Sequence, residues 1–220
     1  VTPYKKRKVR ILNGAHTAFV PGSWVAGFDI VRDCMHDETI RGFMNTMLYD
    51  EVIPTLAADL DVEDCKAFAA AVENRFDNPF IDHALLSICL NSTAKWRARD
   101  LPTLKDYVAE TGNLPKCLST SLATLIAFYT QELVAREGDG LHLRRADGTE
   151  YTAQDDAFVL DFYAAHAGVE DAELVHDVLT NEQMWGEDLT QIAGLEEFVV
   201  NALAVVRAEG VKQAFANAQA

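Results

Sequence analysis

The sequence has 220 residues, enough for one large or two small domains, and 49% of them are hydrophobic, enough to form a substantial core. The formal net charge of −15 makes most of the surface repel a phosphate backbone, so we expect no nucleic-acid partner.

The first predicted element is a helix over residues 8–16, KVRILNGAH. At 3.6 residues per turn, Asn13 lies about 140° and His16 about 80° around the axis from Lys8, so the three polar side chains can face one pocket. A lysine can move a proton, an amide N–H can hold a developing oxyanion and an imidazole can orient a hydroxyl. Spacing alone leaves open a solvated polar helix face, because these residues are common on helix surfaces.

Amphipathic helices are predicted next along the chain. Apolar residues three and four apart predict a helix over residues 40–52 that ends near Pro54, followed by a second helix over residues 62–76 that the preceding aspartate caps. A third helix is predicted from about residue 81 to residue 99. Residues 118–133 are apolar on nearly every side, which predicts a central buried helix.

A non-helical stretch is predicted over residues 137–152. Its Asp147-Gly148 pair is a hairpin turn signal between short alternating runs, so we expect a surface β-hairpin. Helices are predicted again at about residues 155–166, 170–179 and 195–209. The sequence therefore predicts one all-α, multi-helical domain over residues 1–220 with a single small β-hairpin.

The cysteines give no metal or disulfide pattern. Cys34, Cys65, Cys89 and Cys117 are widely spaced without CxxC or CxxH pairs, so we expect reduced core thiols and no metal site. No apolar run reaches the roughly 18 residues needed to span a bilayer, and the sequence starts without an apolar signal region. We therefore expect no membrane partner and a cytoplasmic location.

Several ordered motifs resemble one known family. Lys-x4-Asn-x2-His, at Lys8, Asn13 and His16, resembles the signature of the polyol-specific long-chain dehydrogenases, the mannitol dehydrogenase family. Matching stretches follow at residues 75–102, with RFDNPFIDHALLSICLNSTAKWRARDLP, at 112–116, with GNLPK, and at 185–189, with WGEDL. The resemblance runs from about Thr2 to the end of the chain. It implies the helical C-terminal domain of these enzymes, whose fold is like the C-terminal domain of 6-phosphogluconate dehydrogenase.

The resemblance also implies a chemistry for the first motif. Family members transfer a hydride between a nicotinamide cofactor and a sugar carbon without a metal. Lys8 would then be the general acid and base, Asn13 would contribute to an oxyanion hole and His16 would hold a substrate hydroxyl. A nucleotide-binding Rossmann domain precedes this point in the family, and no GxGxxG motif follows a strand here. We therefore expect NAD to be bound mainly by a Rossmann domain of the same protein, with no cofactor-binding residues in this chain.

A second motif bears on the substrate. Where the mannitol type has Arg-x3-Asp-Gly-Ser-x-Lys, this chain has Ser87 at the arginine position and Asn91 at the aspartate position, and keeps only Lys95. The tagaturonate reductase group shares the Ser-x3-Asn-Ser form. Its keto-acid substrate carries a carboxylate, which favours cationic partners such as Lys95 or Arg97. The implied substrate-binding set is therefore His16, Asn91, Lys95 and Arg97.

The resemblance thus implies interconversion of D-tagaturonate and D-altronate. A fructuronate or mannitol-type reductase domain, or a non-catalytic helical interaction or dimerisation module, remains an alternative. Lys95 and Arg97 also fit a solvated basic helix end, which the helix dipole favours. We interpret Arg75 as part of a helix stop before an Asn-Pro turn, and His83 as one of several histidines without ligand spacing.

Overall fold

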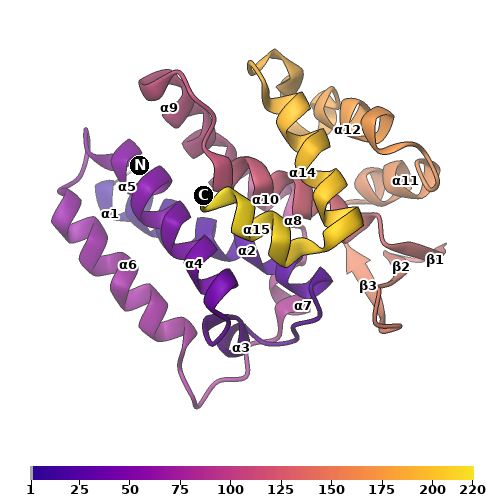
Figure 1. Ribbon diagram of the computed structural model, residues 1–220, viewed down its shortest axis with the longest axis horizontal. Coiled ribbons are helices and arrows are strands. Elements are labelled where there is room, and N and C mark those ends of the chain that lie inside the picture. Colours follow the sequence, from indigo (N-terminus) through magenta and orange to yellow (C-terminus); the bar gives the residue numbers. More distant parts are fainter. Residues whose placement is uncertain (1) are drawn as a thin grey trace.

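The computed structural model describes residues 2–220, which fold into many helices and one small antiparallel sheet (Figure 1). In chain order, the helical elements are α1 (Pro3–Arg7), η1 (Lys8–Asn13), α2 (Gly14–Val25), α3 (Val31–Met35), α4 (Glu38–Thr46), η2 (Met47–Val52), α5 (Ile53–Leu56), α6 (Val62–Phe76), α7 (Leu85–Ile88), α8 (Ser92–Arg99), α9 (Leu101–Thr111), α10 (Lys116–Tyr129), α11 (Ala157–Ala165), α12 (Asp171–Leu179), α13 (Glu182–Trp185), η3 (Leu189–Gln191), α14 (Leu195–Glu209) and α15 (Val211–Ala218). The strands are β1 (Glu132–Glu137), β2 (Gly140–Arg144) and β3 (Glu150–Gln154). The predicted multi-helical fold with a small β element is confirmed.

Helices α2 and α10 form the centre of the fold. Residues 117–129 of α10 are all buried, and so are residues 14–24 of α2 except His16. Helix α10 packs against α2 and also against α14. The close approach of α2 to its neighbours depends on Gly22, because a Cβ there would lie 2.8 Å from the ring of Phe215. His16 is therefore held on a rigid buried helix.

The N-terminal helix differs from the predicted one. One regular helix was expected over residues 8–16, whereas η1 is a π-helical segment between α1 and α2. The backbone N–H of Gly14 donates to the carbonyl of Val9, five residues earlier, which is the hydrogen-bond pattern of a π-helix. Periodicity at 3.6 residues per turn assumes an α-helix, so it cannot detect this wider turn.

The helix predicted over residues 40–52 continues past its expected end. It runs through α4, the π-helical segment η2 and α5, and Pro54 lies at the start of α5. In η2, the buried Glu51 carboxylate accepts the backbone N–H groups of Cys117 at 2.6 Å and Leu118 at 2.9 Å. Burial raises the pKa of Glu51 to about 7, while the two donors favour its charged form. Glu51 thereby caps the N-terminus of the central helix α10.

Other helix predictions were partly right. The helix after Asp61 is confirmed as α6, with the Asp61 side chain accepting the N–H of Asp64 at 2.9 Å. The single helix predicted over residues 81–99 is wrong, because α7 and α8 are separated by Asn91, whose φ of 53° is left-handed and stops a helix. The buried helix predicted over residues 118–133 is confirmed as α10, but its last predicted residues belong to the start of β1.

The predicted hairpin within residues 137–152 is confirmed by β2 and β3, which pair antiparallel with Arg144 opposite Glu150. Strand β1 adds a third member, and the strand order is β1-β2-β3. The sheet lies at the end of the molecule opposite α6 (Figure 1). Arg145 ties it to the end of α2, because its buried guanidinium donates to the carbonyl of Trp24 at 3.1 Å.

The C-terminal part matches its prediction most closely. The helices expected over residues 155–166, 170–179 and 195–209 are α11, α12 and α14, and α14 ends at Gly210, whose φ is 95°. The four cysteines are free and buried, as expected. None of the helices within residues 2–220 combines the length and hydropathy that a bilayer-spanning helix needs.

Candidate active site

The π-helical segment brings the first motif onto one side of the chain. Lys8 and Asn13 are the first and last residues of η1. Residues five apart are hydrogen-bond partners in a π-helix, so Lys8 and Asn13 stand about one turn apart instead of the 140° that an α-helix predicts. His16 follows one α-helical turn later, in α2. The Lys-x4-Asn-x2-His spacing therefore fits a π turn followed by an α turn.

A cavity of about 270 Å³ opens beside this segment. It lies where η1 and α2 face the end of α6 and the loop that leads to α7. The lining residues are Leu12, Asn13, His16, Val31, Arg75, Phe76, Ile81 and His83. Two of the three residues of the first motif thus share one cavity with residues from three other segments.

His16 has an unusual environment in this cavity. Its imidazole stacks on the ring of Phe76 at a centroid distance of 4.0 Å, and His83 meets it edge-on at 5.7 Å. Burial, together with the charges of His83, Arg99 and Lys95, lowers the pKa of His16 to about 3. Its Nε2 is buried without a hydrogen-bond partner among residues 2–220. His16 is therefore neutral, and its buried Nε2 is a ring nitrogen without a partner in the part of the chain that the structure describes.

Asn13 and Lys8 differ in exposure. Asn13 is half-buried on the cavity wall, and its backbone carbonyl accepts the hydroxyl of Thr17 at 2.9 Å. Lys8 is exposed, and its ammonium group forms no hydrogen bond or salt bridge with the other described residues. Lys8 does not itself line the cavity, and it stands one π turn before Asn13, which does.

Helix α8 carries the second motif. Lys95 is half-buried, its Nζ donates to the carbonyl of Ile88 at 2.9 Å, and burial together with the charge of Arg99 lowers its pKa. Lys95 does not line the cavity itself, but its helix α8 packs against α2, which carries His16. Asn91 is exposed just before α8, where its N–H donates to the carbonyl of Gln154 at 3.0 Å.

Arg97 does not join this cluster. It stands two residues after Lys95, which places it on the other side of α8. Its guanidinium packs against Gly186, where a Cβ would lie 2.3 Å from Nη2 of Arg97. Arg97 thus contacts the residues after α13, away from His16.

Two residues at the site were not assigned to it from the sequence, and Arg99, a member of the second motif, was given no role. Arg75 and His83 line the cavity, and Nη1 of Arg99 donates to the Thr17 hydroxyl at 3.1 Å. Arg75 lies in the last turn of α6, as the predicted helix stop requires. That structural role explained the residue in the sequence, so its place in the cavity wall was not predicted. The spacing of four residues between Lys95 and Arg99 could have indicated that the two cations lie together, because residues four apart share a helix face.

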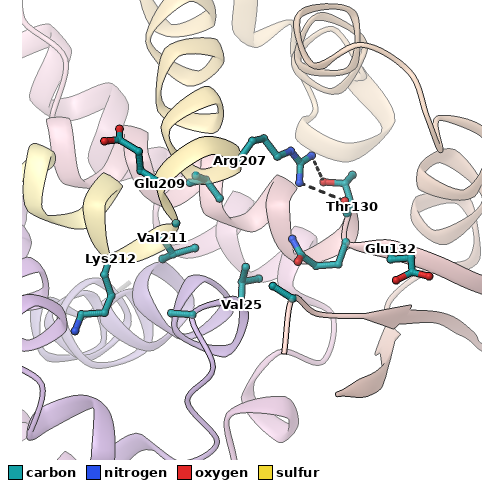
Figure 2. A pocket seen from close by; sticks show the side chains of 12 residues that line it. Val25, Thr130, Glu132, Arg207, Glu209, Val211 and Lys212 are labelled. Carbon is teal, nitrogen blue, oxygen red and sulfur yellow. Dashed lines mark hydrogen bonds between the residues drawn. The ribbon is translucent and has the colours of Figure 1, made fainter. Parts of the chain in front are cut away.

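A second cavity, of about 520 Å³, lies between the end of α2, the start of β1 and the junction of α14 and α15 (Figure 2). Its two cations already contact other protein groups. Arg207 donates to the backbone carbonyl and the hydroxyl of Thr130 and pairs with Asp171, and Lys212 pairs with Asp37 at 2.7 Å. In the part of the chain that the structure describes, no three His, Cys, Asp or Glu side chains gather as metal ligands.

Residues 1–207 match the family model described as mannitol dehydrogenase C-terminal domain. Similar curated proteins are named altronate oxidoreductase. They include those of Pectobacterium atrosepticum, 44% identical over 97% of this chain, of Escherichia coli O17:K52:H18, 42% identical over 97%, and of Yersinia enterocolitica, 40% identical over 98%. The chain spans 42–43% of the length of these relatives.

Two solved structures share the fold. Mannitol 2-dehydrogenase of Pseudomonas fluorescens, in a ternary complex with NAD and D-mannitol, superposes with a TM-score of 0.81 at 20% identity, covering 98% of this chain and 40% of that chain. A D-sorbitol dehydrogenase in substrate-free form gives a TM-score of 0.76 at 18% identity, covering 96% of this chain and 40% of that chain. At these identities the likeness shows the fold.

Proposed function

The chain belongs to the mannitol dehydrogenase C-terminal domain family, and on this premise we propose that it is the substrate-binding catalytic part of an NAD-dependent oxidoreductase that interconverts D-tagaturonate and D-altronate. The observation that carries the proposal is the convergence of η1, α2 and α8 on the neutral, unpartnered imidazole of His16. The altronate oxidoreductases that are 40–44% identical to this chain support the sugar-acid substrate.

Each polar residue at the site has a role in ketone reduction. A bound nicotinamide supplies the hydride that forms the new C–H bond. Lys8 gives a proton to the ketone oxygen as that bond forms, and takes it back in the oxidation. The carboxamide N–H of Asn13 donates to the same oxygen and stabilises its developing negative charge. Nε2 of His16 holds the hydroxyl next to the reacting carbon.

We assign binding of the substrate carboxylate to α8. Lys95 brings an ammonium group to the side of α8 that faces His16, where an anion gains a charge-assisted hydrogen bond. Arg97 is left out of this role, because its guanidinium packs on Gly186. Asn91, exposed at the start of α8, stays a candidate for a substrate hydroxyl.

The cofactor needs a further domain. Residues 2–220 contain no glycine-rich turn between a strand and a helix that could seat a pyrophosphate. We therefore assign dinucleotide binding to a Rossmann domain of the same protein. Phe80 and Ile81 are 92% and 54% exposed in the loop beside the cavity, and large exposed apolar side chains mark contact surfaces. This loop is the proposed contact with that domain.

The four buried free thiols fit a reducing compartment, so we place the protein in the cytoplasm.

A substitution of Lys8 tests the mechanism. In the full-length protein that carries this chain, assayed with NADH and D-tagaturonate, Lys8→Met should lower kcat by about 100- to 10,000-fold, the range of general acid–base catalysis. Lys5→Met is the matched control, because Lys5 is exposed three residues earlier and lies outside the cavity. Unchanged turnover in a folded Lys8→Met protein would rule out the proposed role.

A further inference from the structure

Two cations without carboxylate partners share one face of α8. Lys95 and Arg99 stand four residues apart, about one helical turn, and both are half-buried. Neither takes part in any salt bridge between the described residues, although the chain carries a net charge of −15.

The guanidinium of Arg99 is fixed in place beside the first motif. Its Nη1 donates to the Thr17 hydroxyl at 3.1 Å, and that hydroxyl in turn donates to the carbonyl of Asn13 at 2.9 Å. Thr17 is buried on α2, directly after His16, so this contact anchors Arg99 next to the imidazole. The remaining N–H groups of Arg99 form no hydrogen bond with residues 2–220.

Lys95 is held by one contact, from its Nζ to the carbonyl of Ile88 at 2.9 Å. An ammonium group has three donors, so two are left for a ligand. The charges of Lys95 and Arg99 both reach His16, where they favour the neutral imidazole. The two cations lie on successive turns of one face of α8, a helix that packs against α2.

The nearby carboxyl groups do not neutralise this pair. Asp100 follows Arg99 but is buried, its Oδ2 has no hydrogen-bond partner among the described residues, and burial raises its pKa well above the usual range. Asp155 is engaged by the hydroxyl of Tyr129 and by the N–H of Thr93. Burial lowers the pKa of both Lys95 and Arg99, and the charges of Asp155 and Asp100 offset this only in part.

We propose that Lys95 and Arg99 together bind the carboxylate of a keto-sugar acid, and that Arg99 is the residue that makes the site prefer an acid over a neutral ketose. This inference rests on the proposed reductase function. A guanidinium offers a planar pair of N–H donors that matches a carboxylate, and Lys95 adds a point charge beside it. Binding the acid relieves the repulsion between the two cations, whereas a neutral ketose leaves it in place.

The test compares two substrates in the full-length protein. D-Tagaturonate carries the carboxylate, and D-tagatose has a hydroxymethyl group instead. Arg99→Met should lower kcat/KM for D-tagaturonate by about 10- to 100-fold, mostly through KM, because a hydrogen bond to a charged group is lost. Its kcat/KM for D-tagatose should change by less than about 2-fold. Arg97→Met is the matched control on the same helix, and should leave both substrates unchanged.

Each outcome separates the inference from the proposed function. A wild-type enzyme that reduces D-tagatose as well as D-tagaturonate would refute the keto-acid substrate itself. A wild-type preference for the acid that persists in Arg99→Met would overturn the role of Arg99 alone. Should Arg99→Met fail to fold, Arg99→Lys keeps the charge and loses the planar donor pair. A KM for the acid raised about 3- to 10-fold in Arg99→Lys would then support the inference, and an unchanged KM would overturn it.

Discussion

Two cavities of this molecule differ in how far their polar groups are already bound by other protein groups. In the cavity of about 520 Å³ (Figure 2), Arg207 donates to Thr130 and pairs with Asp171. Lys212 pairs with Asp37, and Glu132 pairs with Arg144 at 2.6 Å. In the smaller cavity of about 270 Å³, the buried Nε2 of His16 has no partner within residues 2–220. The first cavity uses its charges to join elements, and the second keeps its donors for a ligand.

This contrast shows that size alone does not identify the site. Buried polar groups are nearly always hydrogen-bonded in a finished fold, so an unpartnered one on a residue that lines a cavity marks that cavity as a candidate site. The same holds for charge, because Lys95 and Arg99 lack the carboxylates that Arg207 and Lys212 have. The comparison predicts that changes at the small cavity affect catalysis and that changes at the large one affect stability.

The largest expected effect separates two amides. Asn13→Ala should lower kcat by about 100- to 1,000-fold, because it removes an oxyanion donor from the small cavity. Gln131→Ala, in the wall of the large cavity, should leave kcat unchanged, since its side chain only donates to the carbonyl of Ala127. Steady-state kinetics with NADH and D-tagaturonate measure kcat for both variants. Equal kcat values would contradict the assignment of catalysis to the small cavity.

The next prediction concerns pH. The folded-state pKa of His16 is about 3, below the unfolded value near 6.5, so the folded protein binds fewer protons in this range. The free energy of unfolding should therefore show no pH dependence from His16 above pH 6.5 and should fall as the pH drops from 6.5 toward 3. The slope caused by His16 should be at most about 1.4 kcal/mol per pH unit. His16→Gln should flatten that part of the curve.

An NMR titration gives a direct reading of the same group. The ring signals of His16 should stay constant between pH 5 and 8, whereas His176 should titrate above 6.5, because its hydrogen bond to Glu196 raises its pKa. A His16 midpoint near 6.5 would contradict its neutral assignment.

The smallest effect compares two cations in thermal or denaturant unfolding. Arg207→Met should cost about 1–2 kcal/mol, since it breaks the contacts with Thr130 and Asp171, and it should leave kinetics unchanged. Lys95→Met should cost less than about 1 kcal/mol, because Lys95 has no carboxylate partner among the described residues and makes one hydrogen bond, to the carbonyl of Ile88, yet it should raise KM for D-tagaturonate. Equal stability losses in both variants would show that Lys95 is structural as well.

Most of the fold could be predicted where local signals were strong. The apolar period and the Asp61 cap identified α6, and the Asp-Gly turn identified the pairing of β2 with β3. The single helix predicted over residues 81–99 was the clearest error. Asn91 interrupts it with a left-handed backbone conformation that the neighbouring residues do not predict. The family resemblance is confirmed by the match over residues 1–207.

The sequence by itself determined the helical class, the central buried helix and the residues of the first motif, because these depend on composition and short-range spacing. Only the tertiary structure decided which side chains meet. It placed Lys8 and Asn13 on a π turn, brought His83 to His16 and directed Arg99 to Thr17. These contacts join segments up to 82 residues apart, and such packing follows from the whole core rather than from any local pattern.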